Sequence, residues 1–472
     1  MKIIKLLTVF LFSLIIVVPI LTFNFQPNAS SAIDNRMLTE NPFSQASLNG
    51  ENILSENIEN YVNDRIGLRD EMILAYTVLN DKIFGKMVHP NYQYGTDGYV
   101  FGQGLSVSSD QFTTYHVAFA DMIKRIQDFC DERDIPFIFV FDPAKPAVLT
   151  EYIPSGINYD RTWVEEFFAA LDEREVRYID NTEVLKEKTE QGEVVFNQKY
   201  DANHWNDLGA YYGTNSVLEE LQKDFPVLDV NDINDFTVTE ELETSLPVSQ
   251  FPINELIPNI SIDTSNIVDK TYLYGNEIEM DSAYQTFGYY ENLEKLDEGS
   301  PKALVFQGSY MNNYGYKYFE NAFGEYIYVH NYQNVLNFPY YYNVFKPDCV
   351  IFEVTEYTFS NIYFPYEDII QLVMNPELSE MLESGIPQYQ WDLNNEFLYE
   401  TSGTQLTEIF WDTDKLYGYV WISFGEEVYD MIMTENGYEV TIPTEVYDLN
   451  NEITITAFDG FDLIIYEELT DA

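Results

Sequence analysis

Two separate segments of the sequence carry the side-chain types that nucleophilic catalysis requires. The first, YDANHWNDLGA, contains His204, one of only four histidines, three residues after Asp201. On a loop that enters a helix, this spacing can bring the carboxylate to one imidazole nitrogen and leave the other free to accept a proton. A helix-capping turn with an incidental histidine produces the same pattern, so the first segment alone leaves both interpretations open.

The second segment, VFQGSYMNNY, places a serine directly after a predicted strand. Residues 302–306 are largely apolar, and Gly308 and Ser309 precede a helical pattern. At the end of a parallel strand and the start of a helix, backbone N–H groups can stabilise an oxyanion. A serine there is also a common helix N-cap. Together the segments supply a nucleophile (Ser309), a base (His204) and an orienting acid (Asp201), which predicts serine acyl-transfer chemistry.

The sequence predicts neither a metal nor a cofactor. His89, His116 and His330 have no partners at catalytic or metal-ligand spacing, and no set of His and Cys residues suggests zinc. The acidic segments DTDKLYG and FDGFD lack the periodic ligands of a calcium loop. Cys130 and Cys349 each lie in an apolar run, which predicts two buried thiols and no disulfide framework.

The net charge of −55 restricts the partners of the protein. A field of this sign repels nucleic acid and anionic lipid headgroups, so neither is expected as a main partner. It also disfavours a strongly anionic polymer as substrate and favours a neutral or cationic one. The simplest interpretation of the charge is a solvated acidic surface that keeps the protein soluble. The length of 472 residues predicts two domains after an N-terminal targeting segment.

The N-terminus predicts where the protein works. Lys2 and Lys5 precede an apolar run from Leu6 to about Phe25. This pattern is typical of a signal peptide or of a signal anchor that spans a bilayer. Residues 28–32 are small enough to be a cleavage site, but we expect residues 1–32 to be an uncleaved anchor. In either case the rest of the chain is extracytoplasmic, anchored in the membrane or secreted.

The elements that must position the two catalytic segments alternate between helices and short apolar strands. Such an alternation predicts an α/β domain with a parallel sheet covered by helices on both faces. A long acidic, Pro-containing insertion interrupts it at about 225–298. We predict helices over 112–133, 161–173, 207–222 and 310–323, and strands over 135–143, 176–180, KALVFQ, EYIYVHN and CVIFEV.

The pattern of apolar and polar residues in the sequence changes near residue 385. From 386 to 472, segments such as YGYVWISF and NEITITAFDGFDLIIY alternate in strand period, and Asn436-Gly437 is a hairpin signal. We therefore predict a C-terminal β-sandwich-like domain without helices. A carbohydrate-binding role for it would make Trp391, Trp411 or Trp421 candidates for stacking on sugar rings.

Six parts of the chain resemble the alginate O-acetyltransferase-like branch of SGNH hydrolases, which includes Gram-positive proteins named for an Asp-His-His-Trp motif. In that branch the Asp–His motif precedes the serine, a circular permutation relative to ordinary SGNH esterases, and the same order occurs here. The resemblance implies a permuted, flavodoxin-like SGNH domain over 33–385. The matching parts are DNRMLTENPF with YVNDRIGLRDEMI, YGTDGYVFGQG, DPAKPAVLTEYIP, YDANHWNDLGA, FQGSYMNNY and KPDCVIFEVTE.

The resemblance also implies a function. It implies an O-acetyltransferase that modifies an extracellular or cell-wall polysaccharide through an acetyl-serine intermediate, with acetyl groups supplied by a membrane-bound acyltransferase. Lys145 matches the lysine of the family, although it can equally pair with local carboxylates. The candidates for substrate binding are Tyr310, Asn312, Asn313, Trp205 and Lys145.

Two positions depart from the family pattern. The spacing of Asp201 and His204 is the Asp-x-x-His of ordinary SGNH hydrolases, and Glu356-Tyr357 replaces the Glu-Arg of the closing segment. The role of that arginine therefore cannot be transferred. Two other functions remain open: a carbohydrate acetylesterase with the same triad, and a non-catalytic glycan-binding or assembly protein.

Overall fold

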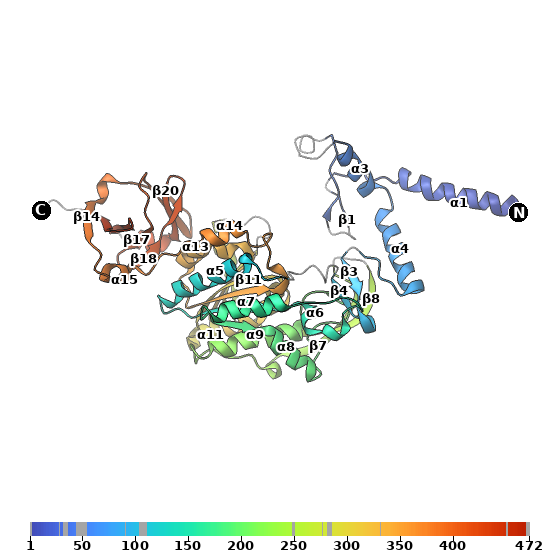
Figure 1. Cartoon of the computed structure of the whole chain (residues 1–472), viewed down its shortest axis with the longest axis horizontal. Coiled ribbons are helices and arrows are strands. Elements are labelled where there is room, and N and C mark those ends of the chain that lie inside the picture. Colours follow the sequence, from blue (N-terminus) through green and yellow to red (C-terminus); the bar gives the residue numbers. More distant parts are fainter. Residues whose placement is uncertain are drawn as a thin grey trace.

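The segments that contain His204 and Ser309 meet at one end of a central β-sheet. The structure, a computed structural model, describes residues 2–27, 29–31, 36–43, 54–89, 91–102, 111–247, 251–275, 277–280, 286–330, 332–449 and 452–468. The molecule is elongated, with an isolated N-terminal helix at one end, an α/β domain in the middle and a strand-rich domain at the other end (Figure 1).

The central sheet is mixed, which corrects the expectation of an entirely parallel one. Its first five strands are parallel, but β10 runs antiparallel to β12, and β9 antiparallel to β10. From edge to edge the strands are β6 (Tyr178–Asp180), β5 (Phe137–Asp142), β13 (Cys349–Thr355), β11 (Lys302–Gln307), β12 (Glu325–His330), β10 (Thr286–Asn292) and β9 (Ile267–Asp269).

The antiparallel direction of β10 follows from the length of its connection to β11. The end of β10 and the start of β11 both pair with Glu325, so they lie at the same end of the sheet. Only residues 293–301 join them, and a crossover between parallel strands needs about a dozen residues or more. The region expected as an insertion thus adds two strands to the edge of the main sheet.

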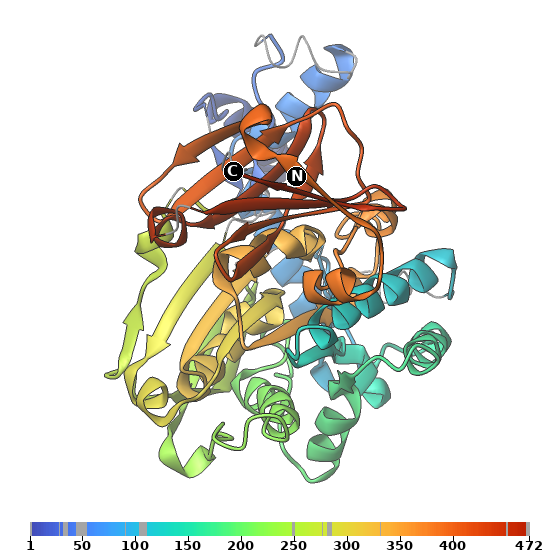
Figure 2. The same ribbon diagram turned by 90° about the vertical axis from the view of Figure 1, so that its left-hand side faces the viewer.

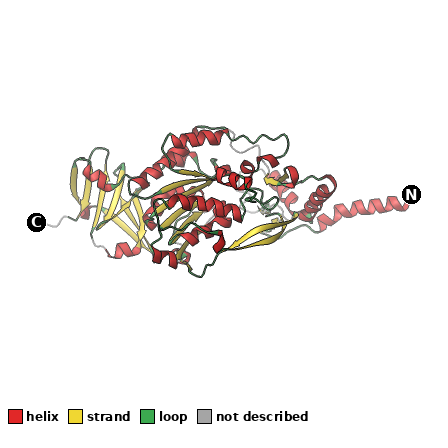
Figure 3. Ribbon diagram, turned by 90° about the horizontal axis from the view of Figure 1, so that it is seen from below, coloured by secondary structure: helices red, strands yellow, loops and turns green. Residues whose placement is uncertain are grey.

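Helices cover both faces of this sheet (Figure 3). Side chains of β5 alternate between the two cores, with Phe139 in one and Val140 in the other. One core includes residues of α5 (Thr114–Asp131), α7 (Thr162–Asp172) and α13 (Phe338–Phe345), and the other includes residues of α8 (Asn181–Glu190), α9 (Asp207–Leu221) and α12 (Tyr316–Ala322). Cys130 and Cys349 are buried free thiols, as expected.

The described part of the N-terminal region contains three helices and one short pair of strands, β1 (Ser30–Ser31) and β2 (Arg36–Met37). Helix α1 (Lys2–Leu21) is long and apolar enough to cross a membrane, and it fits a signal anchor or a signal peptide. Two further helices, α3 (Leu54–Arg65) and α4 (Arg69–Phe84), follow it. Gly67, between α3 and α4, lies so close to the end of α1 that an added Cβ would be 2.3 Å from the carbonyl oxygen of Thr22.

Two hairpins extend beside the active end of the sheet. Strands β3 (Tyr92–Tyr94) and β4 (Val100–Gly102) form one, and β7 (Thr237–Ser245) and β8 (Pro252–Ser261) form the other. The second hairpin belongs to the predicted insertion, and β8 packs against α9. The insertion is therefore part of the structure around the catalytic segments.

The C-terminal domain packs two sheets face to face (Figure 2). Its short helix α16 (Thr444–Leu449) corrects the expectation of a domain without helices, and the hairpin turn lies at 435–436, one residue earlier than expected. In order, the strands of the first sheet are β14 (Gln388–Asp392), β22 (Leu463–Glu467), β21 (Ile453–Phe458), β17 (Tyr419–Phe424) and β18 (Glu427–Asp430). Those of the second sheet are β15 (Phe397–Ser402), β16 (Leu406–Asp412), β20 (Gly437–Pro443) and β19 (Ile432–Thr434).

The tryptophans of this domain are mostly core residues. Trp411 and Trp421 are completely buried, so the expectation that they stack on sugar rings is wrong. Trp391 is 44% exposed, but the Lys415 amine lies 4.4 Å from its ring centroid. The two buried indoles supply core volume instead, because a domain of this size needs large apolar side chains between its sheets.

Candidate active site

Ser309 stands where the sequence predicts it. Strand β11 ends at Gln307, Gly308 forms the turn, and helical backbone begins at Ser309. The Gly308 N–H donates to the carboxylate of Glu353 on the neighbouring strand β13. The helix then continues through a π-helical turn, Met311–Gly315, into α12. π-helical turns are rare and occur frequently at functional sites.

Asp201 and His204 lie on a tight loop immediately before α9. Asp201 has a left-handed backbone (φ 57°), and one of its carboxylate oxygens accepts the backbone N–H groups of Asn203 and His204 at 3.0 and 3.1 Å. The other oxygen lies 2.7 Å from Nδ1 of His204. Nε2 of the same ring lies 2.8 Å from Oγ of Ser309. The structure thus brings the three predicted residues into one hydrogen-bonded row.

The electrostatics of this row favour a proton acceptor facing the serine. Burial opposes the charged form of His204, but Asp201 outweighs it and raises the pKa of the imidazole above its usual value. Burial likewise opposes the charge on Asp201, but His204 and the loop N–H groups lower the pKa of that carboxyl. An ionised Asp201 fixes the proton on Nδ1, which leaves the Nε2 lone pair directed at Ser309.

A fourth side chain, which the sequence analysis did not identify as functional, reaches the row. The hydroxyl of Tyr357 lies 3.3 Å from Nε2 of His204 and 3.4 Å from Oγ of Ser309. Tyr357 belongs to a short 3₁₀ turn directly after β13, the strand next to β11. The sequence showed only that a tyrosine replaces the arginine of the family. Its contact with the serine depends on the pairing of two strands distant in sequence.

Lys145 holds the loop that contains Asp201 by hydrogen bonds to its backbone. Its side chain is completely buried, and Nζ donates to the backbone carbonyls of Val100, Gln198 and Asp201 at 2.8, 3.3 and 3.1 Å. Burial lowers the pKa of Lys145 to about 7, and the nearby Asp201 and Glu255 offset part of this effect. Three carbonyl acceptors match the three hydrogens of the ammonium form. The expected contact with substrate is therefore corrected to a contact with the Asp201 loop.

Glu255 holds the same loop from the side of the β7–β8 hairpin. Its two carboxylate oxygens accept three consecutive backbone N–H groups, from Gln198, Lys199 and Tyr200, at 2.6, 2.9 and 2.6 Å. The loop that leads to Asp201 is thus held by an anion that binds its N–H groups and a cation that binds its carbonyls. No pattern in the sequence indicates this contact, because Glu255 is one acidic residue among many.

Beneath Ser309 lies a buried pair of carboxyl groups, Asp142 and Glu353. Both are completely enclosed, and Asn181 donates to Asp142 at 2.7 Å. Burial raises the pKa of both groups, and the negative field of Glu353 raises that of Asp142 further. Glu353 also accepts the Gly308 N–H. The turn that carries the nucleophile rests on this pair.

The remaining predicted substrate-binding residues have different positions. Tyr310 is completely buried, and its hydroxyl donates to the carbonyls of Pro143 and Asn203. Trp205 is also buried and donates from Nε1 to the Tyr310 carbonyl at 3.0 Å. Direct substrate contact is thus corrected for both, since they join the two catalytic segments instead. Asn312 accepts from Gln307 at 2.7 Å, and Asn313 is exposed at the surface.

Across the described part of the chain, no group of His, Cys, Asp or Glu residues has the geometry of a metal site. His116 caps the start of α5, and His330 is held by the Gln307 carbonyl at 3.0 Å. The arrangement of Asp201, His204 and Ser309 can activate a serine for attack on an acyl group without a metal.

Several solved structures are similar to this chain at low sequence identity. The O-acetyltransferase domain of Pseudomonas putida AlgJ is 14% identical, over 62% of this chain and 95% of that one, with a TM-score of 0.40. Bacillus cereus PatB1 is 15% identical over 60% and 100% of the two chains, with a TM-score of 0.44. Pseudomonas aeruginosa AlgX is 14% identical over 82% and 88%, with a TM-score of 0.39.

Sequence comparison with family models gives a narrower match. No curated protein sequence matches the chain. Residues 93–248, however, match the model of the SGNH hydrolase-like domain of the acetyltransferase AlgX. This range includes Asp201 and His204, whereas Ser309 lies beyond it. The resemblance predicted from the motifs is confirmed for this range: residues 93–248 are similar to the SGNH hydrolase-like domain of the acetyltransferase AlgX.

Proposed function

We propose that the protein is an O-acetyltransferase that esterifies hydroxyl groups of a polysaccharide outside the cytoplasm. The observation that carries this proposal is the row of contacts from Asp201 through His204 to Ser309, with distances of 2.7 and 2.8 Å. The match of residues 93–248 to an acetyltransferase domain supports the choice of acyl group. The acyl group is acetyl, and the enzyme carries it on Ser309.

The reaction proceeds in two steps. In the first, Nε2 of His204 takes the proton of Ser309 as Oγ attacks the acetyl carbonyl of the donor, and the leaving group departs with that proton. In the second, Nε2 takes the proton of a sugar hydroxyl, whose oxygen attacks the acetyl-serine. Ser309 recovers its proton when the ester bond to the enzyme breaks. Asp201 remains ionised and stabilises the imidazolium in both steps.

The N-terminal helix provides a location for this chemistry. Residues Ile3–Leu21 have a mean hydropathy of 2.7 and are almost completely exposed. As an uncleaved anchor, this helix would hold the α/β domain at the outer face of the membrane. A membrane-bound acyltransferase could deliver acetyl groups to Ser309 there. The same triad with poor exclusion of water would give a carbohydrate acetylesterase, which is the second candidate function.

The test begins with the full chain in detergent and an activated acetyl ester. Intact-mass measurement and peptide mapping should find an acetyl group on Ser309 in the wild type and none in Ser309→Ala or His204→Ala. Transfer of the group to added glycan rather than water separates transferase from esterase. If neither the ester nor a serine-directed phosphonate modifies Ser309, the serine chemistry is wrong and a glycan-binding role replaces it.

A further inference from the structure

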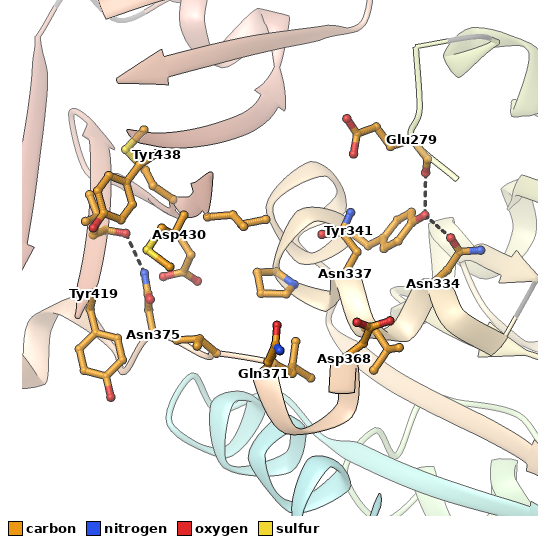
Figure 4. A pocket seen from close by; sticks show the side chains of 18 of the residues that line it. Glu279, Asn334, Asn337, Tyr341, Asp368, Gln371, Asn375, Tyr419, Asp430 and Tyr438 are labelled. Carbon is orange, nitrogen blue, oxygen red and sulfur yellow. Dashed lines mark hydrogen bonds between the residues drawn. The ribbon is translucent and has the colours of Figure 1, made fainter. Parts of the chain in front are cut away.

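A cavity of about 1030 Å³ lies between the α/β domain and the C-terminal domain (Figure 4). One wall comes from η5 (Tyr332–Asn337), α13, Gly275 and residues 278–280, and the opposite wall from β17, β18, β19 and β20. Helix α14 (Tyr366–Gln371) and the segment after it close one side. The described residues that line the cavity do not include the catalytic triad, so the cavity is a separate place on the molecule.

Buried hydrogen bonds between the two domains fix the walls of the cavity. Asn343 on α13 is completely buried, and its amide donates to the carbonyl of Asp430 at 2.7 Å and accepts the Asp430 N–H at 3.1 Å. Asn375 donates to the carbonyl of Val420 at 2.7 Å. Glu277 accepts three consecutive N–H groups of residues 404–406. The cavity is therefore preformed, as binding sites for small ligands usually are.

One buried carboxylate in the cavity lacks a donor. Asp430 is 4% exposed, and its Oδ1 has no hydrogen-bond partner within the described part of the chain. Oδ2 lies 3.5 Å from the guanidinium of Arg133, which is outside the lining. Burial raises the pKa of Asp430 to about 6, although Arg133 and Lys346 oppose the shift. A buried carboxylate oxygen without a donor is costly. Asp430 therefore keeps one unsatisfied oxygen in the wall of the cavity, while Arg133, Lys346 and Asn375 stabilise its charge.

Two further carboxylates, Glu279 and Asp368, border the same space and are exposed to it (Figure 4). Partial burial and, to a smaller extent, the negative field of Glu408 raise the pKa of Glu279. The described lining contains no Lys, Arg or His. The other polar groups are the amides of Gln333, Asn334, Asn337, Gln371 and Asn375 and the hydroxyls of Tyr341, Tyr417, Tyr419 and Tyr438.

We propose that this cavity binds a short segment of a glycan that contains sugars with free, protonated amino groups. The amides of Asn337 and Gln371 and the hydroxyl of Tyr419 can pair with sugar hydroxyls, because each offers both a donor and an acceptor. The exposed carboxylates of Glu279 and Asp368 provide partners for ammonium groups, and the buried Asp430 adds negative charge to the wall behind them. The volume matches the upper range of ligand sites, about 300–1,000 Å³. The proposal rests on the proposed function, since it names the chemistry of the acceptor polysaccharide.

Binding is measured on the full-length Ser309→Ala chain, so that acetyl transfer cannot contribute. Isothermal titration calorimetry at low salt would compare a hexamer of glucosamine, a hexamer of N-acetylglucosamine and a polyuronate hexamer. We expect the glucosamine hexamer to bind at least tenfold more tightly than the N-acetylated one, and the polyuronate not to bind. Equal binding of the two amino-sugar hexamers, or no binding of the glucosamine hexamer, would overturn the proposal.

The variants separate this cavity from the general negative field of the protein. Glu279→Gln with Asp368→Asn should weaken glucosamine binding at least tenfold, and Ile432→Trp, which fills the cavity, should abolish it. Glu367→Gln with Glu380→Gln removes the same charge outside the lining and should change affinity less than twofold. If this control loses affinity equally, binding is nonspecific and the proposal fails. Failure of acetyl-serine formation in the wild type would leave the binding result intact.

Discussion

The hydroxyl of Tyr357 lies 3.3 Å from Nε2 of His204, the ring nitrogen that faces Ser309. In this position it can donate a hydrogen bond to an oxygen that gains negative charge at the serine during acyl transfer. The arginine of related proteins, at the matching place in sequence, carries a permanent charge that tyrosine lacks. The phenol thus gives this site a neutral donor in an otherwise negative protein.

Removal of this donor should slow the reaction without a change in fold. Tyr357→Phe is expected to lower kcat for acetyl transfer about tenfold, which corresponds to ~1.4 kcal/mol of transition-state stabilisation. KM should change little, because the hydroxyl acts on the charge that develops during reaction. Single-turnover formation of acetyl-Ser309 measures the effect. A rate equal to that of the wild type would show that Tyr357 is only a neighbour of the site.

The pH dependence of kcat/KM should report the raised pKa of His204. Because the neutral imidazole is the base, kcat/KM should fall as pH drops through this pKa, with a midpoint above 6.5, the ordinary value for histidine. Asp201→Asn removes the charge that raises the pKa, so the midpoint should move to lower pH. The maximal rate should also fall, by roughly 10³–10⁴-fold, because the tautomer is no longer fixed. A midpoint that is unchanged in Asp201→Asn would contradict this assignment.

Glu255 is expected to act as a positioning residue. Glu255→Gln leaves one acceptor oxygen for three backbone N–H groups, so the loop before Asp201 should lose its fixed position. We predict about a tenfold loss in kcat and a shifted acid limb of the pH profile, because the Asp201–His204 distance is no longer held. A purely structural role would lower stability without moving the pH profile. The matched control is Glu240→Gln, an exposed change on the same hairpin.

Lys145 should make stability depend on pH. Its pKa is lowered from 10.5 to about 7 in the folded state, so between these values the unfolded chain binds more protons. By linkage, this contribution to stability is smallest below about pH 7 and increases with pH up to about 10.5. Thermal unfolding of Lys145→Met should lack that increase. If the stabilities of the wild type and the variant differ by a constant amount across this pH range, Lys145 does not titrate in the folded protein.

The sequence determined the helices and strands that flank the candidate catalytic residues, and it identified Ser309, His204 and Asp201 as those candidates. A continuous apolar run such as 137–142 predicts a strand that is buried on both faces of a sheet, and this pattern can be recognised from the local sequence alone. Ser309 and the pair of Asp201 and His204 could be recognised for the same reason: each stands at the junction of elements that local pattern predicts. The buried thiols followed from the apolar runs around them.

Only the tertiary structure decided which distant groups support that row. Glu255, Tyr357 and Lys145 lie on three different elements, and their roles depend on strand order, on a hairpin folded back over a loop, and on burial. The direction of β10 depended on which end of the sheet its short connection reaches. Hydrogen bonds act over about 3 Å in space, whereas sequence pattern reports only the neighbourhood along the chain. Contacts between segments a hundred residues apart therefore become visible only in the folded molecule.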